Sequence, residues 1–473
     1  MRGSKLYYFL IDLDRSELED LKAFVDSPFF NKKEGPRLLL DYLLQIPGTL
    51  SEHEPALEEE AIFSALYPDR PFKAGVYNKL KNQTLDLLLR YFAQKEYDRD
   101  EGRENVYLLK AFNRRELRKY FPHYYQKSVE RPGPFLEDHF ETMFHLEMEK
   151  SWYHNQAANR SASPHFEDIF IHLRNDFLLR RLRLAVQAEN LARVSQQEIN
   201  LSRFNDLAQL RTRNIEALPL IGQLYHAIFM TLRYPDRDAG YQELVRLLNG
   251  EGADLPPNTA LDFWLGALNY CVRKLNNGNL DFRREALNVY KQMEAAQLLS
   301  YTGDSFALHV KNIVSLSTQL KEFTYAGQFL DRLQDTPQVK RQPHLWTYNR
   351  GVYLFFMGEF APAESAFNQI RGELEDIFYA LDARTFLLRI YYETGNSIGM
   401  ESMIHSFRVF LERNKKVPRA SRKRYMTFIK YFRRLINLPP NGSKRVLKMK
   451  AEIEESGGIS AKEWFLEKLE GLL

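Results

Sequence analysis

The sequence predicts an all-α protein, in which an α-solenoid of helical hairpins follows a small helical N-terminal domain. Apolar residues recur at helical spacing along nearly the whole chain, and the strict alternation typical of strands is almost absent. A motif near the C-terminal end also repeats, since 37 residues separate Ala326 from Ala363 and Ala363 from Met400. A constant period of this size indicates stacked helical hairpins, each of which packs mainly on its neighbours.

The composition is that of a folded chain without a membrane segment. The chain has 473 residues, of which 44% are hydrophobic, and a formal net charge of +4. Its single cysteine, Cys271, rules out an intramolecular disulfide and a Cys-rich zinc site. No apolar run reaches the roughly 18–20 residues that span a bilayer, and the first residues lack a signal-peptide cleavage site. We therefore expect a cytoplasmic protein.

Short helices are expected in the N-terminal domain, which we assign to residues 1–130. Ser16 and Glu19 have the spacing of a capping box and predict the start of the first clear helix. That helix is expected to end at Ser27-Pro28, because the residue before a proline is disfavoured in the helical region. Further helices are expected at 36–45, 57–66 and 76–97. A Pro/Gly-rich segment at 131–134 marks the end of this domain.

Longer helices are expected in residues 131–455, which we interpret as a degenerate helical-repeat array. Apolar periodicity predicts the helices before the repeated motif at 139–154, 166–195, 201–215, 218–234, 241–248, 259–275 and 283–295, of which 166–195 is either one long helix or a broken pair. Residues 456–473 are expected to form a capping helix, since an array needs a lid over its last hairpin. Ser460 and Glu463 have capping-box spacing, and Trp464 and Phe465 begin an apolar stripe.

Residues 345–372 contain the clearest repeat unit. Small residues and an aromatic residue stand at Gly351, Gly358, Ala363 and Phe367, and with these spacings the segment resembles a tetratricopeptide repeat. The resemblance implies two helices that approach closely at Gly351, a tight turn at Gly358, and a Phe367 ring that fills the gap between hairpins. Ala326 matches Ala363 in the preceding unit. The period of 37 differs from the family's 34, so we describe roughly 260–410 as tetratricopeptide-like.

Two further motifs lie near the ends of the chain, Asp26-Ser27-Pro28-Phe29-Phe30-Asn31 and Glu463-Trp464-Phe465-Leu466-Glu467-Lys468. With them, the whole chain resembles an uncharacterised family of cytoplasmic helical proteins from Bacteroidetes-type bacteria. The resemblance implies no activity, so it adds nothing about mechanism.

Motifs that carry chemistry are missing from the sequence. It contains no G-x-x-x-x-G-K-[ST] or G-x-G-x-x-G loop and no G-x-S-x-G elbow. Glu141, His145 and Glu149 are spaced i, i+4 and i+8, which favours a solvated helix face over a metal site. We therefore predict a protein that is not an enzyme and that uses no cofactor and no metal. An enzyme of unrecognised type is the third of our functional hypotheses.

Positive charge is concentrated in residues 408–450, which contain fifteen Lys and Arg residues and one acidic residue, Glu412. This segment therefore carries +14 and leaves about −10 for the remainder, which is typical of a docking surface for an anion. The candidate anion-binding or partner-binding residues are Arg413, Lys415, Lys416, Arg419, Arg422, Lys423, Arg424, Lys430, Arg433 and Arg434. Aromatic residues that could stack on bases are interleaved with these cations, namely Tyr425, Phe428, Tyr431 and Phe432. The other interpretation is that the cations are only the solvated face of one helix, whose core stripe is formed by Tyr425, Phe428, Ile429, Phe432 and Ile436.

The leading functional hypothesis is a non-enzymatic scaffold or adaptor whose concave face binds a protein or peptide partner. It depends on the repeat period and on the missing catalytic motifs. The alternative is a nucleic-acid-associated protein that uses the basic segment, and an acidic protein or peptide is a further candidate for the same surface.

Overall fold

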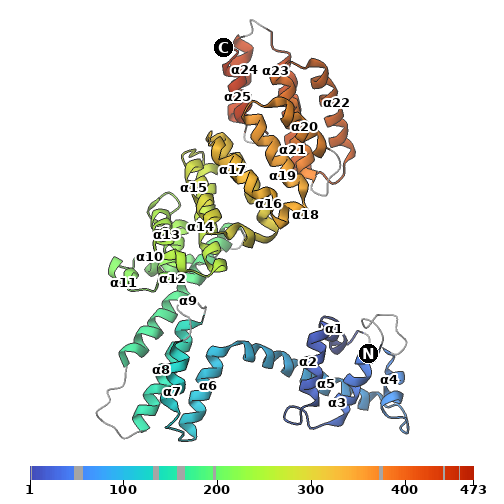
Figure 1. The fold of residues 1–473 in the computed structure, drawn as a ribbon, viewed down its shortest axis with the longest axis vertical. Coiled ribbons are helices and arrows are strands. Elements are labelled where there is room, and N and C mark those ends of the chain that lie inside the picture. Colours follow the sequence, from blue (N-terminus) through green and yellow to red (C-terminus); the bar gives the residue numbers. More distant parts are fainter. Residues whose placement is uncertain are drawn as a thin grey trace. The chain divides into compact units, whose positions relative to one another are not determined.

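Every regular element of the described residues is a helix in the computed structural model (Figure 1). The structure describes residues 1, 3–46, 57–130, 138–156, 166–194, 199–371, 377–439, 443–456 and 459–473. The predicted all-α class is therefore confirmed. The chain divides into two compact units, Met1–Arg181 and Leu182–Leu473, whereas the sequence placed the first boundary at residue 130. The Pro/Gly-rich segment at 131–134 lies outside the described residues.

Unit 1 has two separate hydrophobic clusters. Its helices are α1 (Lys5–Ile11), α2 (Arg15–Asp26), α3 (Glu34–Leu44), α4 (Glu59–Leu66), α5 (Ala74–Arg99), α6 (Glu101–Arg114), α7 (Phe121–Val129), α8 (His139–Gln156) and the first part of α9 (Phe166–Val194). Helices α1 to α5 share one cluster, and Leu109, Phe121 and Leu146 form the second between α6, α7 and α8. Asp100 separates the two groups, because its side chain caps α6 by accepting from the Arg103 backbone N–H at 2.9 Å.

The first long helix of unit 1 begins earlier than predicted. Asp14, and not Ser16, is the N-cap of α2, so the predicted Ser16 and Glu19 capping box is wrong. The Asp14 carboxylate accepts from the Glu17 backbone N–H at 2.9 Å, and the Glu17 carboxylate accepts from the Asp14 N–H at 3.0 Å. Two overlapping acceptor-x-x-Glu patterns occur here, and Asp caps a helix as well as Ser does. The helix ends at Asp26, directly before the predicted stop.

Unit 2 is built from helices that contact their neighbours along the chain (Figure 1). After the end of α9 it contains η2 (Leu201–Phe204), α10 (Asn205–Ala208), α11 (Thr212–Glu216), α12 (Leu220–Arg233), α13 (Ala239–Gly250), η3 (Glu251–Asp254), α14 (Pro257–Asn276), α15 (Phe282–Ala295), η4 (Leu298–Ser305), α16 (Phe306–Gln319), α17 (Phe323–Gln334), α18 (Pro337–Arg341), α19 (Pro343–Phe356), α20 (Phe360–Ile370), α21 (Ile377–Glu393), α22 (Ser397–Arg413), α23 (Arg419–Ile436), α24 (Ser443–Glu455) and α25 (Lys462–Glu470). The helix predicted at 201–215 is wrong, because three short helices occupy that range.

Consecutive helices of unit 2 form pairs, and the first helices of neighbouring pairs also touch. The pairs are α12 with α13, α14 with α15, α16 with α17, α19 with α20, and α21 with α22. Contacts between first helices join α12 to α14, α16 to α19, and α19 to α21. The short helix α18 lies between two of these pairs in sequence.

The turns of the 37-residue repeat share one backbone geometry. Lys321, Gly358 and Gly395 occupy equivalent positions, and their φ angles are 59°, 81° and 69°. In each turn the next residue donates its N–H to the carbonyl five residues earlier, at 2.8, 2.9 and 2.9 Å. Left-handed backbone favours glycine, so Lys321 is the exception. The repeated geometry thus extends to a unit in which the glycine signal is absent.

Close packing surrounds the small residues of the repeat. A Cβ atom on Gly351 would lie 2.9 Å from Cζ of Phe367, which is too close for the two helices as they stand. The Phe367 ring is fully buried and stacks on Phe386 of the next pair, with ring centroids 4.8 Å apart. Ala326 and Ala363 are also fully buried. These contacts position the first helices α16, α19 and α21, which line the candidate site.

Candidate functional site

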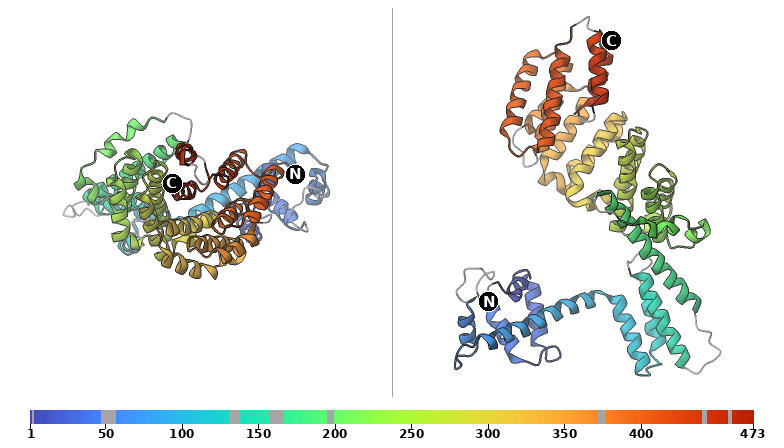
Figure 2. Two further views of the ribbon diagram at one scale, coloured as in Figure 1. Left: turned by 90° about the horizontal axis from the view of Figure 1, so that it is seen from above. Right: turned by 180° about the vertical axis from the view of Figure 1, so that it is seen from behind.

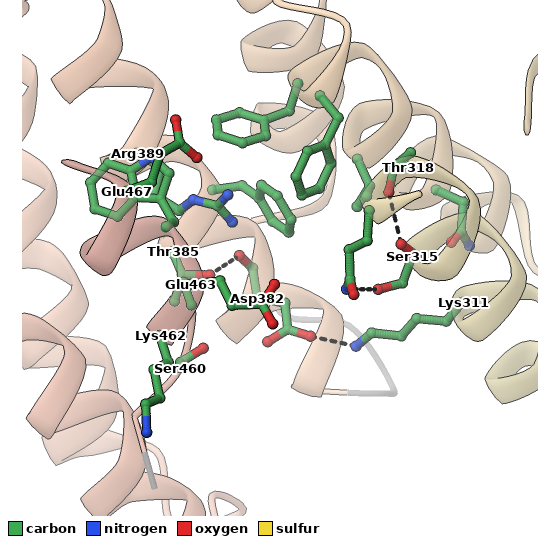
Figure 3. A pocket seen from close by; sticks show the side chains of 18 of the residues that line it. Lys311, Ser315, Thr318, Asp382, Thr385, Arg389, Ser460, Lys462, Glu463 and Glu467 are labelled. Carbon is green, nitrogen blue, oxygen red and sulfur yellow. Dashed lines mark hydrogen bonds and ion pairs between the residues drawn. The ribbon is translucent and has the colours of Figure 1, made fainter. Parts of the chain in front are cut away.

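A cavity of about 830 Å³ in unit 2 is the candidate functional site, and we call it the groove. Its walls come from α16, α19 and α21, the first helices of three successive pairs, and from α25. Figure 3 labels lining residues of α16, α21 and α25. Seen from above in Figure 2, the last helices lie on the inner side of the curve formed by the preceding helices of unit 2. The volume falls in the range of small-ligand and peptide side-chain sites.

Most charged side chains that line the groove are paired with one another. Figure 3 shows one such pair, in which Lys311 of α16 and Asp382 of α21 point toward each other. Lys462 instead donates to the backbone carbonyls of Glu454 at 2.6 Å and Ser456 at 3.3 Å. The pairs are Lys311 with Asp382, Arg283 with Glu463, Lys468 with Glu393 at 2.8 Å, and Lys468 with Glu467 at 3.2 Å. Each of the four lining carboxylates therefore has a cation.

Arg389 of α21 differs from these cations because its guanidinium has no counter-ion among the described residues. Its side chain is 6% exposed, and its buried Nε–H has no acceptor. The guanidinium carbon lies 4.2 Å from the ring centroid of Phe355, 4.7 Å from that of Phe386 and 5.5 Å from that of Trp464. Figure 3 shows the side chain among the rings at the edge of the groove. Burial lowers the pKa of Arg389, since dehydration disfavours the charged form.

Polar groups on α19 complete the lining of the groove. Asn349 is fully buried and donates to the Leu345 carbonyl at 2.8 Å, but its Oδ1 atom has no partner among the described residues. The hydroxyls of Tyr348 and Tyr425 donate to Asp382 at 3.4 and 2.6 Å. Burial raises the pKa of Tyr348, so this phenol stays protonated and remains a donor. Asp382 is thus fully engaged, whereas the Oδ1 atom of Asn349 is a buried acceptor without a partner among the described residues.

The wall formed by α25 begins in a different way from the one predicted. Ala461 is the N-cap, with a left-handed φ of 56°, and no side chain caps the helix, so the Ser460 and Glu463 capping box is wrong. Glu463 instead binds Arg283 at the start of α15. Trp464 is 5% exposed and belongs to the lining of the groove. Tertiary contacts therefore hold this helix in place more than its own first turn does.

The ten candidate cations of the basic segment lie apart from the groove, at the end of α22, in the following loop and on α23. Arg422 and Arg434 are half-buried and engaged, since Arg422 donates to the Asn414 carbonyl at 3.0 Å and Arg434 binds Glu452. The other eight are exposed, and none forms an ion pair with a described residue. We call these eight residues the basic face: Arg413, Lys415, Lys416, Arg419, Lys423, Arg424, Lys430 and Arg433.

The aromatic residues of the same segment belong to the hydrophobic core. Tyr425, Phe428 and Phe432 are fully buried, and Tyr431 is 8% exposed. A base cannot stack on a ring that the protein already covers on its faces. The stacking role is therefore wrong, and the rings are the core stripe of α23, the second of the two interpretations that the sequence left open. Any partner of the basic face would meet side-chain cations without exposed rings.

The histidine and carboxylate pattern on α8 is not a ligand cluster. Glu141 binds Arg180 at 2.6 Å, Glu149 accepts from the Asn113 amide at 2.8 Å, and His145 is exposed. Within the described ranges, no group of three His, Cys, Asp or Glu side chains could hold a metal ion. None of the helices that the structure describes has both the length and the apolar character needed to cross a membrane.

Sequence reasoning did not single out Arg389, and it assigned no binding role to the residues of the groove that it named. Arg389 belongs to no motif, but it is a single cation within an apolar run, Phe386-Leu387-Leu388-Arg389-Ile390-Tyr391. A lone charge in such a run is the signal that could have drawn attention to it, because a helix buried on most sides seldom carries one without a purpose. Comparison with known proteins found no family, no curated protein sequence and no solved structure that matches this chain.

Proposed function

We propose that unit 2 is a tetratricopeptide-like α-solenoid that acts as a non-enzymatic scaffold, and that its groove binds a protein or peptide partner. The groove itself carries the proposal, because three successive first helices face one cavity of about 830 Å³. Stacked helical pairs commonly use such inner surfaces for binding. The lining combines aromatic rings with amides and hydroxyls, the mixture that lets a site hold both side chains and backbone of a polypeptide.

The dimensions favour a short segment of a partner over a whole domain. An extended chain advances about 3.3–3.6 Å per residue, so a cavity of this volume accommodates a few residues. Lining groups that suit a peptide backbone are the half-buried Asn312 and Ser315 on α16. The partner would thus insert a linear segment between α16, α19, α21 and α25.

A substitution that fills the groove tests this proposal. Ser315 lines the groove on α16, so Ser315→Trp should occupy the space of a bound segment and weaken peptide binding at least 10-fold. Lys423→Trp on the basic face is the matched control and should bind as the wild type does. Binding of full-length protein to an array of random decapeptides measures both. Peptide binding that is absent in the wild type, or equal in the two variants, would contradict the proposal.

The basic face favours a second candidate function, association with nucleic acid through its phosphates. Eight exposed cations lie on one segment without ion pairs to described residues. Because the neighbouring rings are buried, such binding would be independent of base sequence and would weaken steeply with salt.

A variant with Lys416→Ala, Arg419→Ala, Lys423→Ala and Arg433→Ala tests the second function without disturbing Arg422 or Arg434, which have internal partners. Affinity for a 20-nucleotide single strand, measured between 50 and 200 mM salt, should fall, and the salt slope should decrease by about 0.7 for each lost contact. If affinity and slope stay unchanged, the basic face does not bind nucleic acid. If polyglutamate displaces the strand, an acidic protein partner is favoured instead.

A further inference from the structure

We propose that Arg389 is the anchor for a single carboxylate of the segment that occupies the groove. The inference rests on the peptide-binding function proposed above and names the chemistry that the groove selects. It starts from one observation: a guanidinium that is 6% exposed lines the cavity and has neither an ion pair nor a hydrogen bond to a described residue. Buried charges in proteins are normally paired or hydrogen-bonded, so this one is an unsatisfied donor group.

The carboxylates of the groove do not supply the missing partner. Glu393 and Glu467 are near enough to act on Arg389 electrostatically, but both are bound to Lys468. Glu393 also accepts from the Trp464 indole N–H at 2.7 Å. Their positions are therefore held by other groups, and the donors of Arg389 are left for an acceptor that enters the cavity.

The surroundings of Arg389 favour one negative charge over two. Rings of Phe355, Phe386 and Trp464 flank the guanidinium, and a carboxylate can bind the edge of a flanked guanidinium through two parallel hydrogen bonds. A phosphate dianion would bring a second negative charge toward Glu393 and Glu467, which already act on this site. The geometry therefore points to a carboxylate and not to a phosphate.

The remaining lining describes the rest of the ligand. The aromatic rings around Arg389 suit an apolar side chain next to the carboxylate, and the half-buried Asn312 and Ser315 line the same cavity and suit a backbone N–H. Acid, apolar group and N–H together describe a polypeptide. Its carboxylate can come from an Asp or Glu side chain or from a free chain end, and binding experiments separate these two sources.

Three pools of random decapeptides serve as probes for the full-length protein. The first contains Asp and Glu and ends in an amide, the second lacks both but has a free carboxyl end, and the third lacks every carboxylate. Wild-type protein should bind the first or the second pool at least 10-fold more tightly than the third, and the preferred pool identifies the source. Arg389→Gln should abolish the preference, and Arg389→Lys should retain part of it. Lys430→Gln removes an exposed cation of the basic face, outside the groove, and should change nothing.

A measurement without any variant guards against misfolding of Arg389→Gln. Saturation-transfer NMR should detect 3-phenylpropionate on the wild-type protein at a concentration where neutral 3-phenylpropionamide gives no signal. Equal binding of acid and amide, equal binding of all three pools, or a preference that survives in Arg389→Gln would overturn the carboxylate anchor while leaving the groove a peptide site. If no pool binds at all, the peptide-binding function itself fails, and the anchor fails with it.

Discussion

The groove and the basic face of unit 2 both carry positive charge, but in opposite surroundings. The basic face has eight exposed cations that stay hydrated. Each of them therefore changes the free energy of folding little by itself. The groove has one buried cation without an ion pair to a described residue, Arg389, which is 6% exposed and has lost most of its hydration. A count of charges along the sequence indicates the basic face as the candidate binding site. The free-energy cost of dehydrating a charge indicates the groove instead, and this cost is the better indicator of a specific site.

The largest expected effect is on folding stability, which should depend on the groove wall far more than on the basic face. Trp464→Ala should lower the free energy of unfolding by about 3 kcal/mol, because it removes a buried side chain. Its ring stacks on that of Phe432, with centroids 6.0 Å apart, and its indole N–H donates to Glu393. Lys423→Ala on the basic face should change it by less than about 0.5 kcal/mol. Urea unfolding followed by circular dichroism measures both. A Trp464→Ala cost no larger than that of Lys423→Ala would show that α25 is not an integral wall.

The second expected effect is whether removal of a charged side chain raises or lowers the free energy of unfolding. Arg389→Met should raise the free energy of unfolding by about 1–2 kcal/mol without ligand, since dehydration costs several kcal/mol and its contacts with the rings return about 2 kcal/mol or somewhat more. Arg434→Met should lower it by less than about 1 kcal/mol, because its pair with Glu452 is partly exposed. Thermal or urea unfolding compares the two. A marked loss of stability in Arg389→Met would mean that this side chain serves packing and not ligand binding.

The smallest expected effect tests whether peptide affinity depends on Arg389 or on the total charge of the groove. Lys321→Gly should raise the free energy of unfolding by about 0.5–1 kcal/mol, because Lys321 has a left-handed φ of 59° that glycine adopts without strain. Peptide affinity should stay within about twofold, although a lining cation is lost. Gly358→Ala at the equivalent turn, with φ 81°, should have the opposite effect on stability. A large loss of affinity in Lys321→Gly would assign recognition to the summed charge and not to Arg389.

Local patterns predicted the helices well and their first residues poorly. Periodicity placed α5, α12, α14 and α15 within two residues of the observed bounds, because apolar spacing extends over several turns. Both predicted capping boxes were wrong, since Asp14 and Ala461 take those positions. A cap involves one or two side chains, and several residues near a helix start can serve equally well. The exact start is then selected by contacts with the rest of the unit.

The sequence by itself determined the all-α class and the glycine turns at Gly358 and Gly395, because these depend on residues a few positions apart. Only the tertiary structure decided that Tyr425 is buried, that Arg283 binds Glu463 from 180 residues away, and that Arg389 has no ion pair with a described residue. Whether a charged side chain is paired or dehydrated depends on its neighbours in space, and contacts between residues distant in the sequence determine those neighbours. The groove is therefore a property of the folded unit, although each of its residues is visible in the chain.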